Sequence, residues 1–291
     1  MNILVALDGS EGAFNALRTA CRLAARSRAT VTALYVNKGQ EYTPEETGWA
    51  GIGERITKEL EAAGERVLEE AREIGEADGS AVEGIRSYGL PAAAILNHVY
   101  DHGVVKLVAL GHSSKGGAAQ EVVVASTTRT VVALAKVPVL VTSAAVQVKQ
   151  VVLAVDEPGP ARNAAAFAGM LARELGANVR ILSVVPSAEA IIALYRQIAE
   201  VRGVSRHVEE SQRAYDRMAE GASSAARGLL EAMALRPETI LRRGRPADEI
   251  LAEAGREELL IVGLRSGPSG RTLGSVANRI LGSRSTTAIF V

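Results

Sequence analysis

The feature that most constrains this chain is an internal repeat with a period of about half its length. An apolar run closed by an aspartate, Ile3 to Asp8, returns as Val152 to Asp156. Two later landmarks recur in the same order: Tyr88-Gly89-Leu90-Pro91 as Arg243-Gly244-Arg245-Pro246, and Leu107 to Gly111 as Leu259 to Gly263. Because solenoid and propeller repeats are roughly 20 to 50 residues long, this period indicates two complete domains of one fold.

Composition narrows the class of partner. The 291 residues give room for two domains of about 145 residues each. Lys plus Arg equal Asp plus Glu at 33 each, so no overall field attracts nucleic acid or an anionic membrane, and we expect neither partner. Cys21 is the only cysteine, which excludes a disulfide framework within the chain and indicates a packing role.

Targeting signals are also missing from the sequence pattern. No basic segment precedes an apolar stretch at the start. Lys136 and Pro138 interrupt the longest apolar region, so nothing approaches the roughly 20 apolar residues of a membrane span. The predicted location is therefore the cytoplasm.

Apolar runs alternate with helical patterns in both halves. Runs rich in Val, Ile and Leu, typical of buried parallel strands, lie at 2–7, 30–36, 105–110 and 137–142, and then at 151–155, 179–185, 239–243, 259–263 and 287–291. Between them, spacings such as Phe14, Leu17, Cys21 and Ala24 predict one-sided helices. With right-handed crossovers, this alternation predicts an α/β fold with two tandem doubly wound parallel sheets. We expect domains at 1–143 and 150–291.

Each half carries a longer segment after its second strand. The first segment, 39–80, includes a charged helix at about 52–76. The second, at about 187–235, predicts two helices broken near Gly203. Its apolar face contains Ile191, Ile192, Leu194, Tyr195 and Ile198. We favour packing of this helical insert on its own domain, with a subunit or partner interface as the alternative.

The site-carrying segments follow from the fold class. In a doubly wound sheet the ligand crevice lies outside the carboxyl ends of the strands, where Asp8 and Gly111 are expected to face each other. The loop Gly111 to Gly117 and the helix start at Ser126 offer backbone amides for phosphate, although Asp8-Gly9-Ser10 also suits a purely structural turn. Neither a Walker A loop nor Gly-x-Gly-x-x-Gly is present, which disfavours P-loop hydrolases and typical dinucleotide enzymes.

The ordered set of motifs resembles the universal stress protein family, in tandem. The set comprises Asp-Gly-Ser after the first strand, Gly-x-Pro before the third helix, a strand ending in Gly, a glycine-and-serine loop, Ser-Thr, and Val-Pro-Val-Leu-Val. The resemblance implies an adenine-nucleotide α-hydrolase-like fold with five strands per domain in the order 3-2-1-4-5 and pairing of fifth strands between domains. It also implies ATP bound without a chemical role in many members and no nucleotide in others.

The nucleotide-binding subgroup carries Gly-x-x-Gly, nine residues, then Gly-Ser or Gly-Thr, and the first half departs from it. Ser114 stands in place of the second glycine, and Ala125-Ser126 replaces Gly-Ser one residue late. The resemblance implies contacts of Ala6, Asp8 and Val36 with adenine and ribose. It places Gly111, Ser114, Ser126 and Thr127 around the phosphates.

The second half departs differently. Asp156, Gly263, Gly274, Ser275 and Val276 match the family pattern, whereas Ser266 replaces a glycine and the loop is two residues shorter. Glu157-Pro158 replaces Gly-Ser, which adds a carboxylate and removes a backbone donor. Arg265 and Arg271 can still attract phosphates. The resemblance ranks the two sites nearly level, with at least one binding nucleotide.

The sequence gives little support for catalysis or metal binding. No Gly-x-Ser-x-Gly elbow is present, and Asp8, Asp156 and Glu157 are the carboxylates near the expected crevices, so we predict no enzyme and leave slow incidental ATP hydrolysis open. His98 and His102 with Asp101 lack a further ligand, so no metal site is expected. His112 is either a phosphate contact or an exposed loop residue.

The leading hypothesis is a stress-response protein regulated by ATP or a related adenine nucleotide, which Mg²⁺ can accompany. Bound nucleotide would order a loop and alter a surface seen by a protein partner. The alternative is a nucleotide-free interaction or scaffolding module that uses the helical insert. An enzyme of the wider α-hydrolase-like group is third, because its signature motifs are missing. We expect a homodimer, or a monomer with intramolecular domain pairing.

Overall fold

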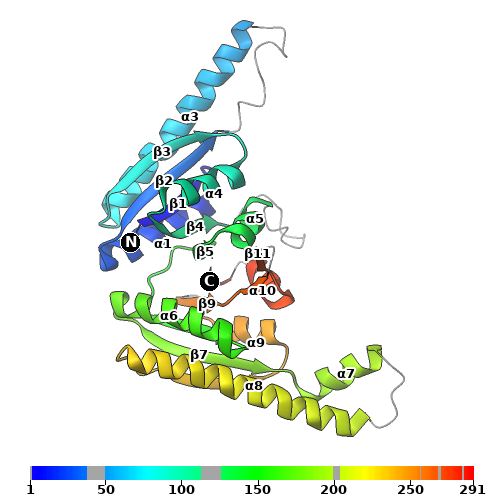
Figure 1. Cartoon of the computed structure of the whole chain (residues 1–291). Helices are drawn as coiled ribbons and strands as arrows, with labels where there is room; N and C mark the ends of the chain where they lie inside the picture. The colour runs from blue at the N-terminus through cyan, green and yellow to red at the C-terminus, as the bar shows by residue number, and fades with distance from the viewer. Residues whose placement is uncertain are drawn as a thin grey trace. The chain divides into compact units, whose positions relative to one another are not determined.

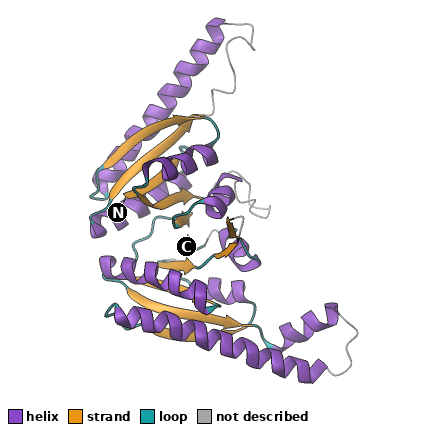
Figure 2. Cartoon of the chain, in the orientation of Figure 1, coloured by secondary structure: helices purple, strands orange, loops and turns teal. Residues whose placement is uncertain are grey.

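The computed structural model describes residues 2–37, 50–112, 126–198, 204–255, 257–267, 270–283 and 285–291. The chain divides into two compact units, one built mainly from the first half of the sequence and the other mainly from the second. Each unit contains a β-sheet flanked by helices (Figures 1 and 2). The α/β fold predicted from the alternating apolar runs is confirmed.

The first unit has the predicted strand order. Its elements are β1 (Asn2–Leu7), α1 (Glu11–Ser27), β2 (Thr30–Asn37), α3 (Ala50–Ala77), β3 (Val82–Tyr88), α4 (Pro91–His102), β4 (Val105–Gly111), α5 (Ser126–Leu134) and β5 (Val139–Thr142). The strands lie in the order β3-β2-β1-β4-β5, which is the 3-2-1-4-5 arrangement. Pairings of β1 with β2 and β4, of β2 with β3, and of β4 with β5 are all parallel.

The second unit repeats this arrangement. The elements of the second half of the chain are β6 (Gln150–Val155), α6 (Pro158–Leu175), β7 (Asn178–Val185), α7 (Ala188–Ile198), α8 (Val204–Ala232), β8 (Glu238–Arg243), α9 (Pro246–Glu253), β9 (Glu258–Val262), β10 (Arg265–Gly267), β11 (Gly270–Thr272), α10 (Ser275–Leu281) and β12 (Thr287–Phe290). All lie mainly in the second unit except β11, of which Gly270 and Arg271 belong to the first. The sheet order is β8-β7-β6-β9-β12, again 3-2-1-4-5. The short strands β10 and β11 were not predicted, since the sequence there indicated only a loop.

Apolar burial explains which strands the sequence reveals. Ile3, Leu4 and Val5 in β1 are fully buried, as are Val151, Val152 and Leu153 in β6. In contrast, β3 was not located from apolar runs. It is an edge strand in which partly buried and exposed positions mix and none is fully buried, and its sequence, VEGIRSY, has no continuous apolar run. Edge strands bury less side-chain surface and therefore give a weak apolar signal.

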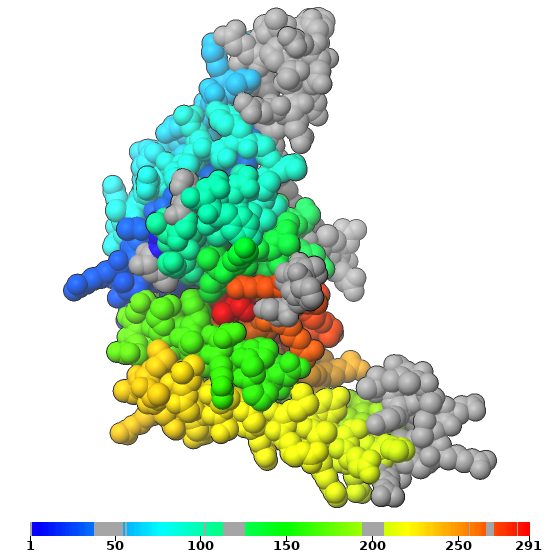
Figure 3. Space-filling view, viewed as in Figure 1, coloured from blue at the N-terminus to red at the C-terminus, as the bar shows by residue number. Residues whose placement is uncertain are grey.

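The helix α8 packs on its own unit, which is the arrangement favoured for the insert. It contacts α6, α7, β6 and β7. Ala222, Ala226 and Leu230 are fully buried in that contact. In α7, Ile191 is buried, whereas the side chains of Leu194, Tyr195 and Ile198 lie outside the described residues. Along its length α8 forms a large part of the surface of its unit (Figure 3, yellow).

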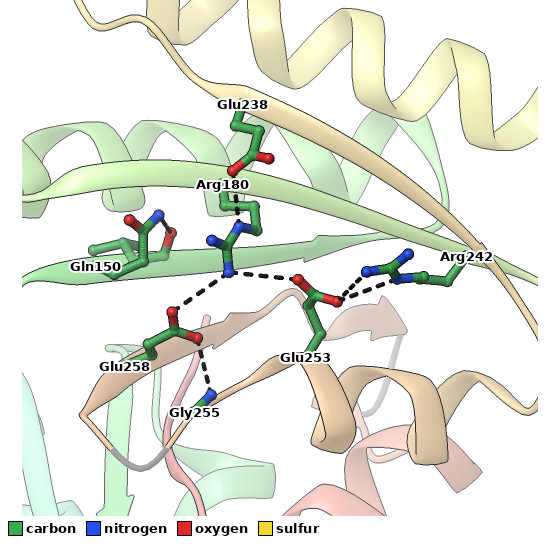
Figure 4. Close-up of polar contacts among 8 residues, drawn as sticks. Gln150, Arg180, Glu238, Arg242, Glu253, Gly255 and Glu258 are labelled. Atoms are coloured by element: carbon green, nitrogen blue, oxygen red, sulfur yellow. Dashed lines mark hydrogen bonds and ion pairs between the residues drawn. The ribbon is translucent and has the colours of Figure 1, made fainter.

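An ion-pair network joins neighbouring strands and a helix in the second unit (Figure 4). Arg180 of β7 reaches Glu238 at 3.0 Å, Glu258 at 3.4 Å and Glu253 at 3.5 Å. Arg242 reaches Glu253 at 2.8 Å. The side chain of Arg180 is 22% exposed, and its bond to Glu238 raises the pKa of its guanidinium. The network therefore ties β7, β8, α9 and β9 together.

Two further expectations concern burial and membrane spans. Cys21 is fully buried, so its predicted packing role is confirmed. Burial, followed by the charge of Asp78, raises the pKa of the Cys21 thiol to about 12. In the part of the chain that the structure describes, no helix has the length and apolar character needed to cross a bilayer.

Candidate functional site

A cavity of about 350 Å³ lies in the second unit at the carboxyl ends of β6, β7 and β9. The strand ends contribute Ala154 and Val155, then Val184 and Val185, then Val262. In the sheet β6 pairs with β7 on one side and β9 on the other, so strand order reverses at β6. The cavity therefore occupies the place where ligands bind in doubly wound sheets.

Five sequence-predicted residues of the second half line this one cavity. They are Asp156, Gly263, Gly274, Ser275 and Val276. Asp156 directly follows β6, and Gly263 directly follows β9. Gly274 directly precedes α10, and Ser275 and Val276 are its first two residues. Asn278 donates its side-chain amide to the carbonyl oxygens of Leu273 and Gly274, which fixes the turn into α10. Segments more than 100 residues apart in sequence thus meet at one cavity.

One arginine and two carboxylates form ion pairs beside the cavity. The Arg265 guanidinium lies 2.7 Å from a carboxylate oxygen of Glu157 and 3.4 Å from one of Asp156. The side chains of Arg265 and Asp156 are more than half exposed, and that of Glu157 is 34% exposed. Arg265, which the sequence offered as a phosphate contact, is therefore already paired with two carboxylates.

The start of α6 explains where these carboxylates lie. Glu157 is the N-cap residue with extended backbone (φ −130°), its side chain makes no capping hydrogen bond, and Pro158 occupies the first turn. Negative charge is favoured at a helix N-terminus because the peptide dipoles leave partial positive charge there. Both carboxylates therefore lie at a helix end where their negative charge is favoured, beside the cavity.

Sequence motifs missed the apolar walls of the cavity. Tyr215, Met218 and Ala219 come from α8, and Pro246 and Ile250 come from α9. Arg243 at the end of β8 pairs with Asp216 of α8 at 2.9 Å, which holds this part of α8 beside the cavity. Pro246 belongs to a repeated landmark and was detectable, whereas Tyr215 and Met218 follow no motif and depend on the packing of α8.

Two other residues expected at the second-half site, Ser266 and Arg271, do not strengthen the case for it. The backbone of Ser266 lies in β10, but its side chain lies outside the described residues. Arg271, which belongs to the first compact unit, donates to the carbonyl oxygen of Val137 at 3.0 Å and does not line the cavity. Burial lowers the pKa of the Arg271 guanidinium. Its expected role in attracting phosphate therefore has no support in this arrangement.

In the first unit the turn after β1 is engaged in capping α1. Asp8 accepts a hydrogen bond from the Ser10 amide at 3.0 Å, and the Ser10 hydroxyl accepts one from the Ala13 amide at 3.2 Å. Gly9 adopts φ +76°, a left-handed conformation that favours glycine. The structural explanation of Asp8-Gly9-Ser10 as a turn thus accounts for these contacts.

Two of the other first-half site residues lie near the carboxyl ends of their strands. Ala6 pairs in register with Leu34 and Leu110, and Val36 lies near the end of β2. Ser126 and Thr127 open α5, whereas Ser114 lies outside the described residues.

Gly111 and its neighbour make close contacts at the end of β4. A Cβ on Gly111 would overlap the backbone of Gly12 and Ala13, so α1 approaches β4 very closely. His112 was expected to contact phosphate or lie exposed in a loop, but it is 6% exposed. Its backbone amide donates to Thr142 at 2.8 Å, which extends the β4–β5 pairing by one residue and explains the burial.

Comparison with known proteins shows which family has this architecture. The universal stress protein family model matches residues 1–143 and again 147–287. The chain belongs to the universal stress protein family, in tandem form. Universal stress protein YxiE of Bacillus subtilis (strain 168) is 33% identical over 144 residues, which is 48% of this chain and 96% of that protein.

Solved structures agree at the level of the fold. A universal stress protein from Archaeoglobus fulgidus DSM 4304 aligns with a TM-score of 0.69 and 17% identity, covering 99% of this chain and 97% of its own. A functionally unknown protein, PA1789 from Pseudomonas aeruginosa PAO1, aligns with a TM-score of 0.61 and 16% identity, covering 100% and 92%. The tandem universal stress fold therefore extends over the whole chain.

The first universal stress domain has a second, polar cavity of about 280 Å³. It lies between β3 and α4 and is lined by Ser87, Asn97, His98 and Asp101, among others. Within the described ranges, no group of three or more His, Cys, Asp or Glu side chains is placed to hold a metal ion. The side chain of His102, the other histidine of the predicted pair, lies outside the described residues.

Proposed function

We propose that the second universal stress domain binds an adenine nucleotide in the 350 Å³ cavity, and that the protein acts in stress response through this binding. The observation that carries the proposal is the convergence on one cavity of Asp156, Gly263, Gly274, Ser275 and Val276. These are residues to which the family motif assigns nucleotide contacts. Family membership supports the proposal and does not itself identify a ligand.

The lining of the cavity supports a ligand with a flat apolar part and a polar rim. Small-molecule sites occupy roughly 300 to 1,000 Å³ and have mainly apolar walls with a few polar groups. Here Val185, Ile250 and Met218 contribute apolar surface, while Asp156 and Ser275 contribute an acceptor and a hydroxyl. A purine with a ribose matches both kinds of surface.

The proposed role is regulatory. The carboxylates beside the cavity are bound to Arg265, and the described residues there offer no evident base or metal cluster to activate water. A ligand in this cavity would contact α8, α9, α10 and three strand ends at once. Such a ligand would stabilise one arrangement of these elements, and a protein partner would recognise that arrangement.

The test is to denature freshly purified protein, identify any released adenine nucleotide by chromatography, and repeat after adding ATP and, separately, AMP. Asp156→Ala and Asp8→Ala are matched variants, because each removes the aspartate that follows the first strand of its domain. We expect Asp156→Ala to lose the nucleotide and Asp8→Ala to retain it. Absence of adenine nucleotide from the wild-type protein as purified and after addition of either ATP or AMP would contradict the proposal.

A further inference from the structure

We infer that the cavity of the second domain selects a purine nucleoside or nucleoside monophosphate over the triphosphate. This inference rests on the proposed function and specifies its ligand class. It follows from three observations on the described residues: the charge beside the cavity, the pairing of Arg265, and the apolar wall supplied by α8.

The charge beside the cavity is negative. Arg265 is the one Lys or Arg among the described residues that line the cavity. Among the lining residues the charges of Asp156 and Arg265 cancel. Glu157, which pairs with Arg265 beside the cavity, then leaves a sum of one negative charge for the three groups. A phosphate monoester carries about −1.5 to −2 at neutral pH, and each further phosphate adds negative charge. The electrostatic environment therefore opposes a triphosphate more strongly than a nucleoside.

Because Arg265 is already paired, its guanidinium cannot readily neutralise the charge of a bound phosphate. To bind a phosphate, the guanidinium would have to leave a carboxylate at 2.7 Å and another at 3.4 Å. Those carboxylates would then stand unpaired close to the bound phosphates. Like charges a few ångströms apart near a protein surface repel substantially. The arrangement thus favours a ligand that leaves the ion pairs intact.

The apolar wall suits a base. Tyr215 and Met218 of α8 line the cavity together with Ile250 of α9. An aromatic ring and a polarisable thioether both make favourable contacts with the face of a purine. Because the cavity volume of about 350 Å³ is near the lower end of the small-molecule range, a nucleoside uses most of the space.

The experiment is isothermal titration of the full chain with adenosine, AMP and ATP at fixed ionic strength. We expect adenosine and AMP to bind at least about tenfold more tightly than ATP, a ratio that modest electrostatic differences supply. ATP binding as tightly as adenosine would overturn the inference while leaving the proposed function in place. Failure of all three ligands to bind would overturn both.

Glu157→Gln tests the charge argument. Removing this carboxylate is expected to improve ATP affinity about threefold to tenfold and to change adenosine affinity less than about twofold, with the gain shrinking at high salt. The matched control is Glu174→Gln, which makes the same charge change near the other end of α6. Equal effects of the two variants, or no gain for ATP in Glu157→Gln, would contradict the assignment.

Tyr215→Ala tests the location. Loss of base–aromatic contact is expected to weaken adenosine, AMP and ATP alike by about tenfold. An unchanged far-ultraviolet circular dichroism spectrum and melting temperature would show that the variant remains folded. Unchanged affinities in this folded variant would place the ligand elsewhere and overturn the inference.

Discussion

The two domains begin with the same apolar run and aspartate but use the following turn differently. In the first domain, Gly9 and Ser10 cap α1, and α1 lies so close to β4 that Gly111 has no room for a side chain. In the second, the nearest atom to a Cβ on Gly263 is 3.5 Å away, and a ligand-sized cavity opens at the strand ends. A shared motif therefore does not ensure a shared site geometry. The space at the strand ends depends on how closely the first helix of each domain approaches the glycine that ends the fourth strand.

A second difference lies between the third strand and the helix that follows it. The strand registers place Thr32 in the first domain where Arg180 stands in the second. The repeat likewise aligns Ser87 with Arg242 and His98 with Glu253. Ion pairs among Arg180, Arg242 and Glu253 fill this place in the second domain, whereas a cavity of about 280 Å³ lies there in the first. In the first domain α1 fills the space at the strand ends that is a cavity in the second. In the second domain ion pairs fill the space beside the third strand that is a cavity in the first.

The largest expected effect comes from the matched glycines at the ends of β4 and β9. Gly111→Ala should destabilise the first domain by about 3 kcal/mol, because the new methyl group overlaps the backbone of α1 and forces it to move. Gly263→Ala should change the stability of the second by less than about 0.5 kcal/mol, since its Cβ meets only ordinary van der Waals contacts. Denaturant unfolding monitored by hydrogen exchange in each domain measures both changes in stability. Equal destabilisation by the two substitutions would refute the claim that Gly111 has less room for a side chain than Gly263.

The ion-pair network gives the next largest effect. Arg180→Met should destabilise the second domain by about 2 kcal/mol, because three glutamates lose their common partner. The control is Arg213→Met, whose pair with Glu209 is more than 70% exposed on both sides and should matter by less than about 0.5 kcal/mol. Hydrogen exchange in β7 and β8 is the measurement. A loss no larger than that of the control would show that the network contributes little.

The helix starts should differ more modestly. Ser10→Ala removes the capping bond to the Ala13 amide and should cost about 1 kcal/mol. Glu157→Ala removes no capping bond and only a partly exposed ion pair, so we expect less than about 0.5 kcal/mol. Thermal unfolding of the two variants compares them. A larger loss for Glu157→Ala would mean that its pair with Arg265 is structural.

Cys21 provides a reporter for the first domain alone. With the pKa of its thiol raised to about 12 by burial, the folded protein should resist thiol reagents near neutral pH, and labelling should follow opening of the first domain. Gly111→Ala should accelerate labelling, whereas adenosine should leave the rate within about twofold, because its proposed site lies in the other unit. Strong protection of Cys21 by adenosine would argue for a ligand in the first domain.

The raised pKa also fixes the sign of a pH dependence. The folded-state pKa of Cys21 exceeds its ordinary value of 9.0, so the folded state holds this proton more tightly. Its contribution to stability is therefore fully present below pH 9 and is lost as pH rises toward 12. Alkaline unfolding of a Cys21→Ala variant should show a weaker decline over this window.

The sequence was most informative where a physical requirement leaves a local pattern. Strands such as β1 and β6 are buried on both faces and had to be continuously apolar. The edge strand β3 had no such requirement and was missed. Motif positions such as Gly263 and Gly274 could be named from the resemblance to the family motif. Tyr215 depends on how α8 packs against its sheet, which no local pattern records.

The most direct test of the central claim is hydrogen–deuterium exchange of the full chain with and without adenosine. Binding in the second domain predicts slower exchange at residues 154–157, 215–219, 262–265 and 272–277, which supply or adjoin the cavity. The matched segments 6–10 and 110–112 of the first domain should exchange as before. Protection confined to 6–10 and 110–112 would place the ligand in the first domain and contradict the account.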